Sequence, residues 1–445
     1  MALSLKQAGK LTGLTLLGTV LGLSAGTFAS SKPSNKSETY DQLVLFADVL
    51  SRVQNDYVEE VESPELVENA LNGVLQSLDP HSRYVPPAAF EKQQERARRE
   101  YGGLGIEVSM ESGFVKVNYA NQGAPASRAG IVAGDLITHV EGVSVEGKTL
   151  NQAVEKMRGL AGDPIKITVK SVDRAPREIT VVREVVQGRA VRHRILEGLG
   201  YIYLETFNNE NVARDLAEAI DLLEKENNAP LPGLILDIRN NGGGLLDQSV
   251  DVSGHFLSGG EVVSVRGRKD DDIDRYHAKH GQKLAGVPMI VLINGNSASA
   301  SEIVAGALQD RGRALVVGTP TFGKGSVQSV YPLRGGKEGA LRLTTARYFT
   351  PAGSSIQGLG IKPDVWVESF PDDGKKRIRI SESSLPHALD AIIKKTEGDD
   401  QKEKKIKKLY PPEDWPEDKD FQIEQAVKIL KSTDFKTRLR QAFND

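Results

Sequence analysis

Cysteine is absent from all 445 residues of this chain. Its absence excludes disulfide bonds, zinc sites built on thiolates, a cysteine nucleophile and a lipid-modified amino-terminal cysteine. Histidine is scarce as well, and the seven histidines do not gather with neighbouring acids at the spacings of metal ligands. We therefore expect no metal ion and no other cofactor.

The chain also lacks an excess of charge of either sign. Its 57 basic and 60 acidic residues give a formal net charge of −3, so no nucleic-acid partner is expected. Hydrophobic residues make up 39% of the chain and charged residues 26%, a balance that excludes wholesale disorder. A length of 445 residues leaves room for about two to four domains.

Long hydrophobic runs are missing except at the amino terminus. There Lys6 and Lys10 precede an apolar stretch, Leu11 to Leu23, which small residues follow. This order is typical of a secretory signal peptide covering residues 1–29, with cleavage after Ala29. The alternative is an uncleaved anchor in the inner membrane, although the run is shorter than the ~20 residues that span a bilayer. Either alternative places the protein outside the cytoplasm, and we expect a bacterial periplasm.

Residues 30–100 are predicted to form a linker followed by helices. Residues 30–38 are small and polar, as in linkers. From Tyr40 onward apolar residues recur at helical spacing, and a second such pattern covers Leu66 to Leu78. Asp79-Pro80 then stops the helical pattern.

Residues 101–185 change to the alternating pattern of strands, with one helical stretch. This succession resembles a PDZ domain. A glycine-rich loop would then offer backbone N–H groups to a carboxylate, and the adjoining strand would pair with an incoming peptide. The residues of this predicted binding loop are Gly103, Leu104, Gly105 and Ile106. The alternative is that the glycines only form a tight turn.

Residues 186–370 form the largest predicted domain. Apolar strands alternate there with helical patterns at Val212–Leu223 and Glu302–Leu308, which favours a layered α/β architecture.

Residues 371–445 are rich in charge and have a helix-like stretch at Ile423–Leu430. We expect a charged, helical carboxyl-terminal tail. It would be either a flexible appendage or an element of assembly.

Ser299 and Lys324 stand 25 residues apart, in S-A-S-A-S-E and T-F-G-K-G-S-V-Q, and neither segment contains histidine. A serine hydroxyl is a weak nucleophile until a base removes its proton. Burial disfavours the ammonium form of lysine, so a buried lysine can be that base. The pair therefore suggests a Ser/Lys hydrolase. Ser299 also suits the N-cap of a helix that continues through Glu302, and the two roles are compatible.

Three further motifs accompany these segments: L-D-P-H-S-R-Y (78–84), L-D-I-R-N-N-G-G-G-L-L (236–246) and T-T-A-R-Y-F-T-P-A-G-S-S-I-Q-G-L-G-I-K-P-D (344–364). With them, the chain from about Leu43 to Val367 closely resembles the carboxyl-terminal processing (tail-specific) serine proteases. The resemblance implies a multidomain α/β protein in which a crotonase-like α/β sandwich core carries an inserted PDZ domain and helical segments at both ends. It also implies an endopeptidase that engages its substrates near their carboxyl termini.

The resemblance assigns roles to individual residues. Ser299 matches the nucleophile, Lys324 the general base and Gln328 the residue that helps to hold the base. On a strand Lys324 and Gln328 would point to the same face, and an uncharged amide could bond the amine without raising its pKa. Gly244 matches an oxyanion donor, and the N–H of Ala300, directly after the serine, is placed to be the other. Gly242 stands where many relatives have proline, a difference that leaves the donor in place.

Arg158, in the R-G-L-A-G turn of the PDZ-like region, matches an arginine that relatives use to couple peptide capture to the active site. The alternative is an ordinary surface arginine. As partners we expect protein or peptide substrates with accessible carboxyl termini, and an adaptor protein and homo-oligomer formation stay open.

Four other interpretations compete with this one. G-x-x-x-x-G-K at 318–324 is the start of a phosphate-binding loop, but that motif needs Ser or Thr next and then a helix, whereas Gly325 and a strand-like segment follow. A Ser-His-Asp triad stays open, because sequence does not show proximity. A PDZ-containing scaffold would bind tails without cutting them, and a degenerate pseudoprotease would keep its lysine charged.

Overall fold

The computed structural model describes residues 35–91, 101–120, 123–171, 174–185, 190–279, 281–375, 377, 379–392, 407–435 and 437–439. The predicted signal peptide lies outside these residues. In the part of the chain that is described, no helix has both the length and the apolar character needed to cross a membrane. The chain divides into two compact units, Met1–Val67 and Glu68–Asp445.

Two helices, at the two predicted positions, open the described part of the chain. They are α1 (Asn35–Asp56) and α2 (Ser63–Gln76). The apolar side chains of α1 are not buried: Leu43 is 56% exposed and Val44 61%. Helical spacing therefore predicted the helix correctly, but none of the described residues covers the apolar face that it produces.

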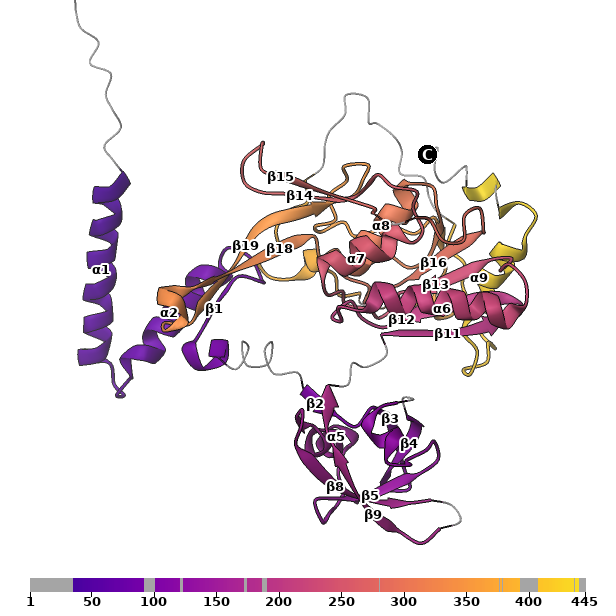
Figure 1. Ribbon diagram of the computed structural model, residues 1–445. Coiled ribbons are helices and arrows are strands. Elements are labelled where there is room, and N and C mark those ends of the chain that lie inside the picture. The colour runs from indigo at the N-terminus through magenta and orange to yellow at the C-terminus, as the bar shows by residue number, and fades with distance from the viewer. Residues whose placement is uncertain are drawn as a thin grey trace, which may run out of the picture. The chain divides into compact units, whose positions relative to one another are not determined.

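A PDZ-like domain is built from short strands around its own apolar core (Figure 1). Its larger sheet has the order β3-β4-β5-β8-β9, with β6 paired to β5, and a smaller sheet has the order β10-β2-β7. The strands are β2 (Tyr101–Gly103), β3 (Ile106–Glu111), β4 (Phe114–Ala120), β5 (Leu136–Val140), β6 (Val143–Ser144), β7 (Gly159–Leu160), β8 (Pro164–Lys170), β9 (Arg177–Val182) and β10 (Glu184–Val185). The helices are α4 (Pro125–Arg128) and α5 (Leu150–Met157).

A six-stranded sheet forms the centre of the largest domain, in the order β11-β12-β13-β16-β17-β20. The first two strands pair antiparallel and the remaining neighbours pair parallel. The strands are β11 (Val191–Leu196), β12 (Leu199–Leu204), β13 (Leu234–Asp237), β16 (Met289–Ile293), β17 (Leu315–Gly318) and β20 (Val365–Trp366). Every residue of β16 is buried, as expected of a central strand covered on both faces.

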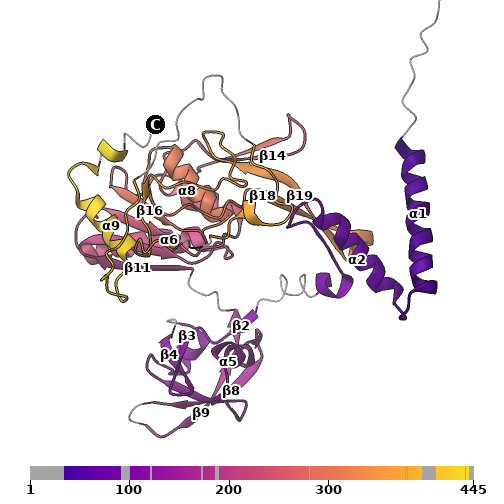
Figure 2. The same cartoon turned by 180° about the vertical axis from the view of Figure 1, so that it is seen from behind.

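Helices cover both faces of this sheet, in agreement with the predicted α/β layers. Side chains alternate along each strand, so Val291 packs with α6 (Val212–Asn227), α7 (Leu246–Gly254) and α8 (Ala300–Asp310), whereas Leu292 packs on the opposite face. The opposite face is covered by α9 (Phe421–Lys431), coloured yellow in Figures 1 and 2.

The position of α9 changes the prediction for the carboxyl-terminal tail. Phe421 is 8% exposed and the side chain of Gln422 donates a hydrogen bond of 2.7 Å to the carbonyl of Val367. Arg239, next to the end of β13, forms an ion pair of 2.8 Å with Asp420 at the start of the helix. Residues 407–435 are therefore part of the folded core. The predicted boundary at residue 370 falls too early, because charge-rich composition does not show that the helix has a buried apolar face.

A second sheet carries the segment that follows Lys324. Its order is β1-β19-β14-β15, and β18 pairs with β19. The strands are β1 (Arg83–Val85), β14 (Glu261–Arg266), β15 (Ile273–His277), β18 (Ser326–Pro332) and β19 (Ala340–Phe349). Because β1 pairs with β19, the L-D-P-H-S-R-Y motif is joined to the sheet that holds the predicted base.

Candidate active site

Ser299 lies at the corner between β16 and α8, as the strand–turn–helix pattern predicts. Its backbone has φ 56° and ψ −112°, which is uncommon for a residue with a side chain. Conformations of this kind cost about 1–3 kcal/mol and gather at functional sites. The hydroxyls of its neighbours are engaged elsewhere, Ser297 with the carbonyl of Ile238 (2.9 Å) and Ser301 with that of Asn241 (2.8 Å). Both neighbours are fully buried and Ser299 is half-buried, so the structure favours Ser299 among the three serines.

The glycine loop after β13 is fastened to this corner by Asn241. The backbone carbonyl of Asn241 accepts from the N–H of Ala298 (3.1 Å), and its side-chain oxygen accepts from the N–H of Gly243 (3.0 Å). A Cβ atom on Gly243 would lie 2.9 Å from the Cβ of Ser299 and 3.0 Å from the nitrogen of Ala300. The loop therefore lies directly against the serine, and glycine is required for that approach.

Gly244 and Ala300, the two predicted oxyanion donors, flank the same corner. Neither N–H donates a backbone hydrogen bond to another described residue, so both can serve a ligand. Gly244 has φ 150°, and a Cβ there would lie 2.2 Å from the carbonyl carbon of Phe207. By contrast, a Cβ on Gly242 would meet nothing within 4 Å, so a residue with a side chain would fit at that position.

The carboxylate of Glu302 connects the serine segment to the lysine segment. Its Oε2 accepts from the backbone N–H of Ser299 (2.7 Å) and from that of Lys324 (2.9 Å). Its Oε1 accepts from the hydroxyl of Thr321 (2.6 Å) and from the N–H of Gly323 (2.7 Å). Burial raises the pKa of this fully buried carboxyl to about 7, and the four donors act in the opposite direction. Sequence reasoning assigned Glu302 only to the helix and missed this role.

Lys324 is half-buried beside this carboxylate, at the segment that leads into β18. Burial lowers the pKa of its amine below the ordinary value, and the positive charge of Arg342 lowers it further. The carboxylates of Glu382 and Glu302 raise it, but they do not reverse the direction. Two carboxylates therefore act on the amine of Lys324, and burial together with Arg342 still keeps its pKa below the ordinary value.

Gln328 does not take the position expected from strand alternation. Its amide nitrogen donates to the hydroxyls of Ser326 (2.9 Å) and Thr344 (3.3 Å) and not to the amine of Lys324. Lys324 precedes β18, and the register of that strand shifts between Val327 and Gln328. The alternation of side chains along β18 therefore does not extend to Lys324, and the prediction depended on it. In this structure Gln328 therefore contacts residues around the base, not the base itself.

A chain of buried polar groups supports the lysine segment from the other side. The amide of Gln357 accepts from the N–H of Gly325 (3.0 Å) and donates to Glu382 (3.0 Å). Glu382 also bonds His81, 2.8 Å away, and its backbone N–H donates to the carbonyl of Phe322. Burial raises the pKa of Glu382, but the hydrogen bonds from His81 and Gln357 outweigh burial and leave it lowered. Glu382 lies beyond the predicted end of the core, and sequence reasoning missed it.

Asp79 supports the neighbouring strand. It accepts hydrogen bonds from the hydroxyls of Ser82 (2.5 Å) and Thr344 (2.9 Å), and Thr344 in turn accepts from Gln328. Burial raises the pKa of Asp79, but these bonds keep it below the ordinary value. The D-P-H-S sequence predicted the end of a helix and gave no local sign of this second contact.

The predicted peptide-binding loop lies at the start of β3. Gly105 has φ 72°, Leu104 is 3% exposed, and the carbonyl of Leu104 accepts from the N–H of Ala126 (2.9 Å). Gly103 ends β2, and Ile106 begins β3, which is an edge strand in the sheet of the described residues. An edge strand beside a glycine turn can pair with an added peptide strand.

Arg158 lies at the carboxyl end of α5. Its guanidinium donates to Glu155 over 3.1 Å, and the two side chains are 59% and 70% exposed. Exposed pairs of this kind contribute about 0–1 kcal/mol to stability, so a structural role for Arg158 would be small.

The structure contradicts the phosphate-loop interpretation. Gly325 follows Lys324, and the residues after it form β18 and not the helix that a phosphate-binding loop requires. Across the described ranges, no three histidines or acids gather into a group that could hold a metal ion.

Comparisons with known proteins agree with this architecture. The sequence model of Peptidase family S41 matches residues 198–367, a PDZ domain matches 116–171, and the "Activating protease CtpB N-terminal domain" matches 9–87. Together with the fold, these matches define the protein as a serine-type peptidase with a PDZ domain.

Similar proteins narrow the class to one family. A carboxy-terminal-processing protease of Bartonella bacilliformis is 45% identical over 403 residues, covering 89% of this chain and 90% of that protein. A probable CtpA-like serine protease of Staphylococcus aureus is 32% identical over 363 residues, or 81% of this chain and 72% of that protein. Among solved structures, the photosystem II D1 C-terminal processing protease is similar, with 30% identity, a TM-score of 0.44 and coverage of 74% and 94%. The chain belongs to the carboxy-terminal-processing proteases of peptidase family S41.

Proposed function

We propose that this protein is an endopeptidase that cuts extracytoplasmic proteins near their carboxyl termini with a Ser299/Lys324 dyad. The observation that carries the proposal is the shared carboxylate oxygen of Glu302, which holds the backbones of both residues. The lowered pKa of Lys324 supports its role as the base. A crotonase-like arrangement of the core and a periplasmic location are part of the same proposal, following the family resemblance and the amino-terminal sequence.

The proposed reaction has two halves. The Oγ of Ser299 attacks the substrate's carbonyl carbon, and its proton passes to the neutral Nζ of Lys324. As the tetrahedral intermediate collapses, the C–N bond breaks and the ammonium returns the proton to the leaving amine. Water then attacks the acyl-enzyme and gives a proton to Lys324, the ester C–O bond to Ser299 breaks, and the ammonium returns the proton to the Oγ of Ser299 as the carboxylic acid is released. No oxidant or metal is needed for either half.

The oxyanion of each tetrahedral intermediate would bind to the N–H groups of Gly244 and Ala300. Their position at the serine corner and the absence of backbone acceptors for them among the described residues support this role. Preorganised donors stabilise a developing charge without reorganising during the reaction. Gln328 would hold the base only after a rearrangement, since its present partners are Ser326 and Thr344.

The PDZ domain would capture substrate tails. The loop of Gly103 to Ile106 would bind the terminal carboxylate, and the free edge of β3 would pair with the preceding residues. Arg158 would couple this capture to the dyad. This proposal is compatible with an adaptor protein and with a homo-oligomeric assembly.

Cleavage of an unfolded protein tests the proposal. Wild type should produce fragments with new carboxyl termini, whereas Ser299→Ala and Lys324→Ala should lose at least about 10³-fold in kcat/KM. Ser258→Ala and Lys337→Ala, which replace exposed residues of the same types, serve as matched controls and should cut like wild type. Fragments from Ser299→Ala at the wild-type rate would contradict the dyad. Tail binding by wild type without any cleavage would favour a PDZ scaffold or a pseudoprotease.

A further inference from the structure

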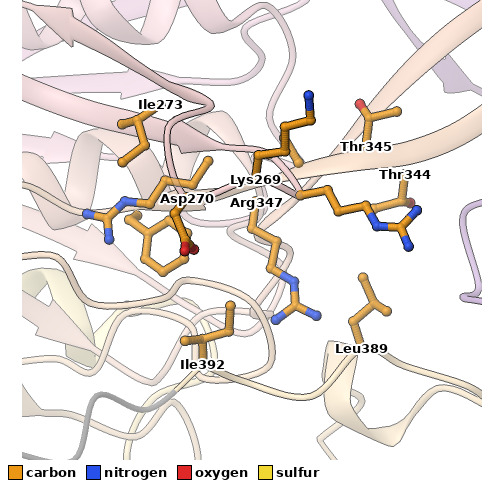
Figure 3. Close-up of a pocket in the computed structure, with 13 residues that line it drawn as sticks. Lys269, Asp270, Ile273, Thr344, Thr345, Arg347, Leu389 and Ile392 are labelled. Atoms are coloured by element: carbon orange, nitrogen blue, oxygen red, sulfur yellow. The ribbon is translucent and has the colours of Figure 1, made fainter. Parts of the chain in front are cut away.

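A cationic cavity of about 600 Å³ opens in the second sheet of the core (Figure 3). Its walls come from the end of β14, the turn that follows it, the middle of β19 and the segment around Leu389. The cavity has a charged part and an apolar part. The charged side chains are Arg266, Arg268, Lys269, Asp270 and Arg347, and the large apolar ones are Ile273, Phe349, Leu389 and Ile392.

Basic side chains outnumber acidic ones in the lining of this cavity by four to one. Among the described residues, none of the four basic side chains forms an ion pair with a carboxylate. Arg266 lies 4.1 Å over the ring of Phe349 and contacts the hydroxyl of Ser264, and Arg347 donates to the backbone carbonyl of Asp390. All these partners are neutral. Asp270 is the one acid among the described residues that line the cavity, and the other acids of the β14–β15 turn lie outside the lining.

The strand register places two of these cations side by side. Arg266 of β14 stands directly opposite Arg347 of β19, so both side chains lie on the same face of the sheet. Like charges in directly opposed positions destabilise a sheet. A bound anion between two guanidinium groups would remove this repulsion, and arginine binds a carboxylate in a two-point geometry.

The same register connects the cavity to the proposed base. Arg347 is also opposite Ser326 of β18, two residues after Lys324. The N–H of Tyr348, next to Arg347, donates to the carbonyl of Gly325 over 2.7 Å. Thr344, on the cavity wall, accepts from Gln328. One wall of the cavity is therefore bonded directly to the segment that follows Lys324.

We propose that this cavity is a substrate subsite that binds a carboxylate of the peptide close to the scissile bond. Arg266 and Arg347 hold the carboxylate, and Phe349, Leu389 and Ile392 take the adjoining aliphatic carbons. The inference rests on the proposed function and deepens it by naming a charged specificity element. The carboxylate has two sources, the peptide's own carboxyl terminus or an Asp or Glu side chain.

A peptide series distinguishes the two sources. A site that wild type cuts in an unfolded protein is first mapped by mass spectrometry, and a quenched fluorescent peptide is made around it. The peptide is prepared with a free or an amidated carboxyl terminus, and with Asp or Asn at each position on both sides of the cut. Removing the recognised carboxylate should lower kcat/KM about ten- to hundredfold in wild type. If amidation lowers kcat/KM, the recognised carboxylate is the peptide's carboxyl terminus. If replacing Asp by Asn lowers it, the recognised carboxylate is a side chain.

Arginine variants then locate the effect. In Arg266→Gln and in Arg347→Gln the acid and neutral peptides should be cut at nearly equal rates, because the variants lose the preference itself. Arg334→Gln, an exposed arginine in the β18–β19 connection, is the matched control and should keep the wild-type preference. The two arginines are on different strands, so the two substitutions disturb different parts of the sheet. If one variant does not fold, the other still tests whether the cavity binds the carboxylate.

Three outcomes would overturn the inference. One is an equal rate for acid and neutral peptides in wild type. Another is a preference that persists unchanged in both arginine variants, which would assign the carboxylate to the PDZ loop. The third is failure of the proposed function itself, and labelling of Ser299 by a fluorophosphonate separates it from the others. Wild type that labels and cuts without any preference defeats only the subsite, whereas wild type that neither labels nor cuts defeats the peptidase mechanism.

Discussion

The backbone N–H groups of Ser299 and Lys324 donate to the same oxygen of the Glu302 carboxylate, over 2.7 and 2.9 Å. One buried side chain thus fixes the start of α8 and the segment that leads into β18. The same carboxylate accepts two more hydrogen bonds, from Thr321 and Gly323. The distance between the proposed nucleophile and base therefore depends on a residue that takes no part in the proposed chemistry.

Replacing this carboxylate should weaken both the fold and the reaction. In Glu302→Gln the new amide nitrogen cannot accept, so the buried donors on that side lose their acceptor and unfolding becomes easier by about 1–3 kcal/mol. We expect kcat to fall at least about tenfold with a smaller change in KM, since the segments of Ser299 and Lys324 separate. Denaturant unfolding and peptide kinetics measure the two effects. The control is Glu224→Gln on the exposed face of α6, and an unchanged kcat in Glu302→Gln would contradict the positioning role.

The pH dependence of stability provides a second test of Glu302. Its pKa is raised from 4.5 to about 7 in the folded protein, so between these pH values the native state binds more protons at this group than the unfolded state. The contribution of Glu302 to stability should therefore fall as pH rises from about 4.5 to 7, by about 3 kcal/mol in total.

Unfolding of Ser299→Ala at pH 5 and pH 7.5, compared with Ser299→Ala/Glu302→Gln, isolates this contribution because glutamine does not titrate. The serine substitution prevents self-cleavage during the measurement. The stability advantage of the single variant over the double variant should be smaller at pH 7.5. An advantage that is the same at both pH values, or larger at pH 7.5, would mean that the carboxylate stays ionised throughout.

The pH profile of cleavage should respond to two charges near Lys324 in opposite directions. Glu382 raises the pKa of Lys324, so Glu382→Gln should move the acidic limb of the kcat/KM profile to lower pH. Arg342 lowers that pKa, so Arg342→Gln should move the limb to higher pH. Glu338→Gln serves as an exposed control. Limbs that stay in place in both variants would indicate that another group is the base.

The oxyanion role of the glycine loop can be separated from its flexibility. Gly244→Ala would bring a Cβ within 2.2 Å of the carbonyl carbon of Phe207 and shift the loop, and loss of one oxyanion donor lowers kcat about 10²–10³-fold. Gly242→Ala is the matched control, because a Cβ there meets no atom within 4 Å. Steady-state kinetics and thermal unfolding of both variants are measured together. Equal losses in both would show that loop stiffness, and not a donor, controls the rate.

Arg158→Ala should lower cleavage of protein substrates several-fold and leave stability unchanged, since its ion pair with Glu155 is exposed. Fluorophosphonate labelling of Ser299 should proceed as in wild type, which would place the defect in substrate coupling. Glu155→Gln removes the same ion pair without removing the arginine and is the control. Unchanged turnover in Arg158→Ala would end the coupling hypothesis.

The sequence alone determined the elements and the residue types that carry the chemistry. Apolar periodicity located α6, α8 and the buried strands, and glycine clusters marked the loops that lie against other backbone. Helices, strands and turns depend on residues that are close together in the sequence, so the spacing of apolar residues and glycines is enough to predict them. The motif around Ser299 predicted a strand–turn–helix corner for the same reason.

Only the tertiary structure decided which polar groups surround the dyad. Glu302 and Lys324 are 22 residues apart, and His81 and Glu382 are 301 residues apart. No local period records such contacts, because they depend on how separate segments pack. Lys324 lies before the start of β18, so Gln328 bonds Ser326 and Thr344 instead of the base, and burial of α9 made part of the charged tail a layer of the core. Burial strengthens electrostatic effects, so the protonation of Lys324 is a property of this packing and not of the sequence around it.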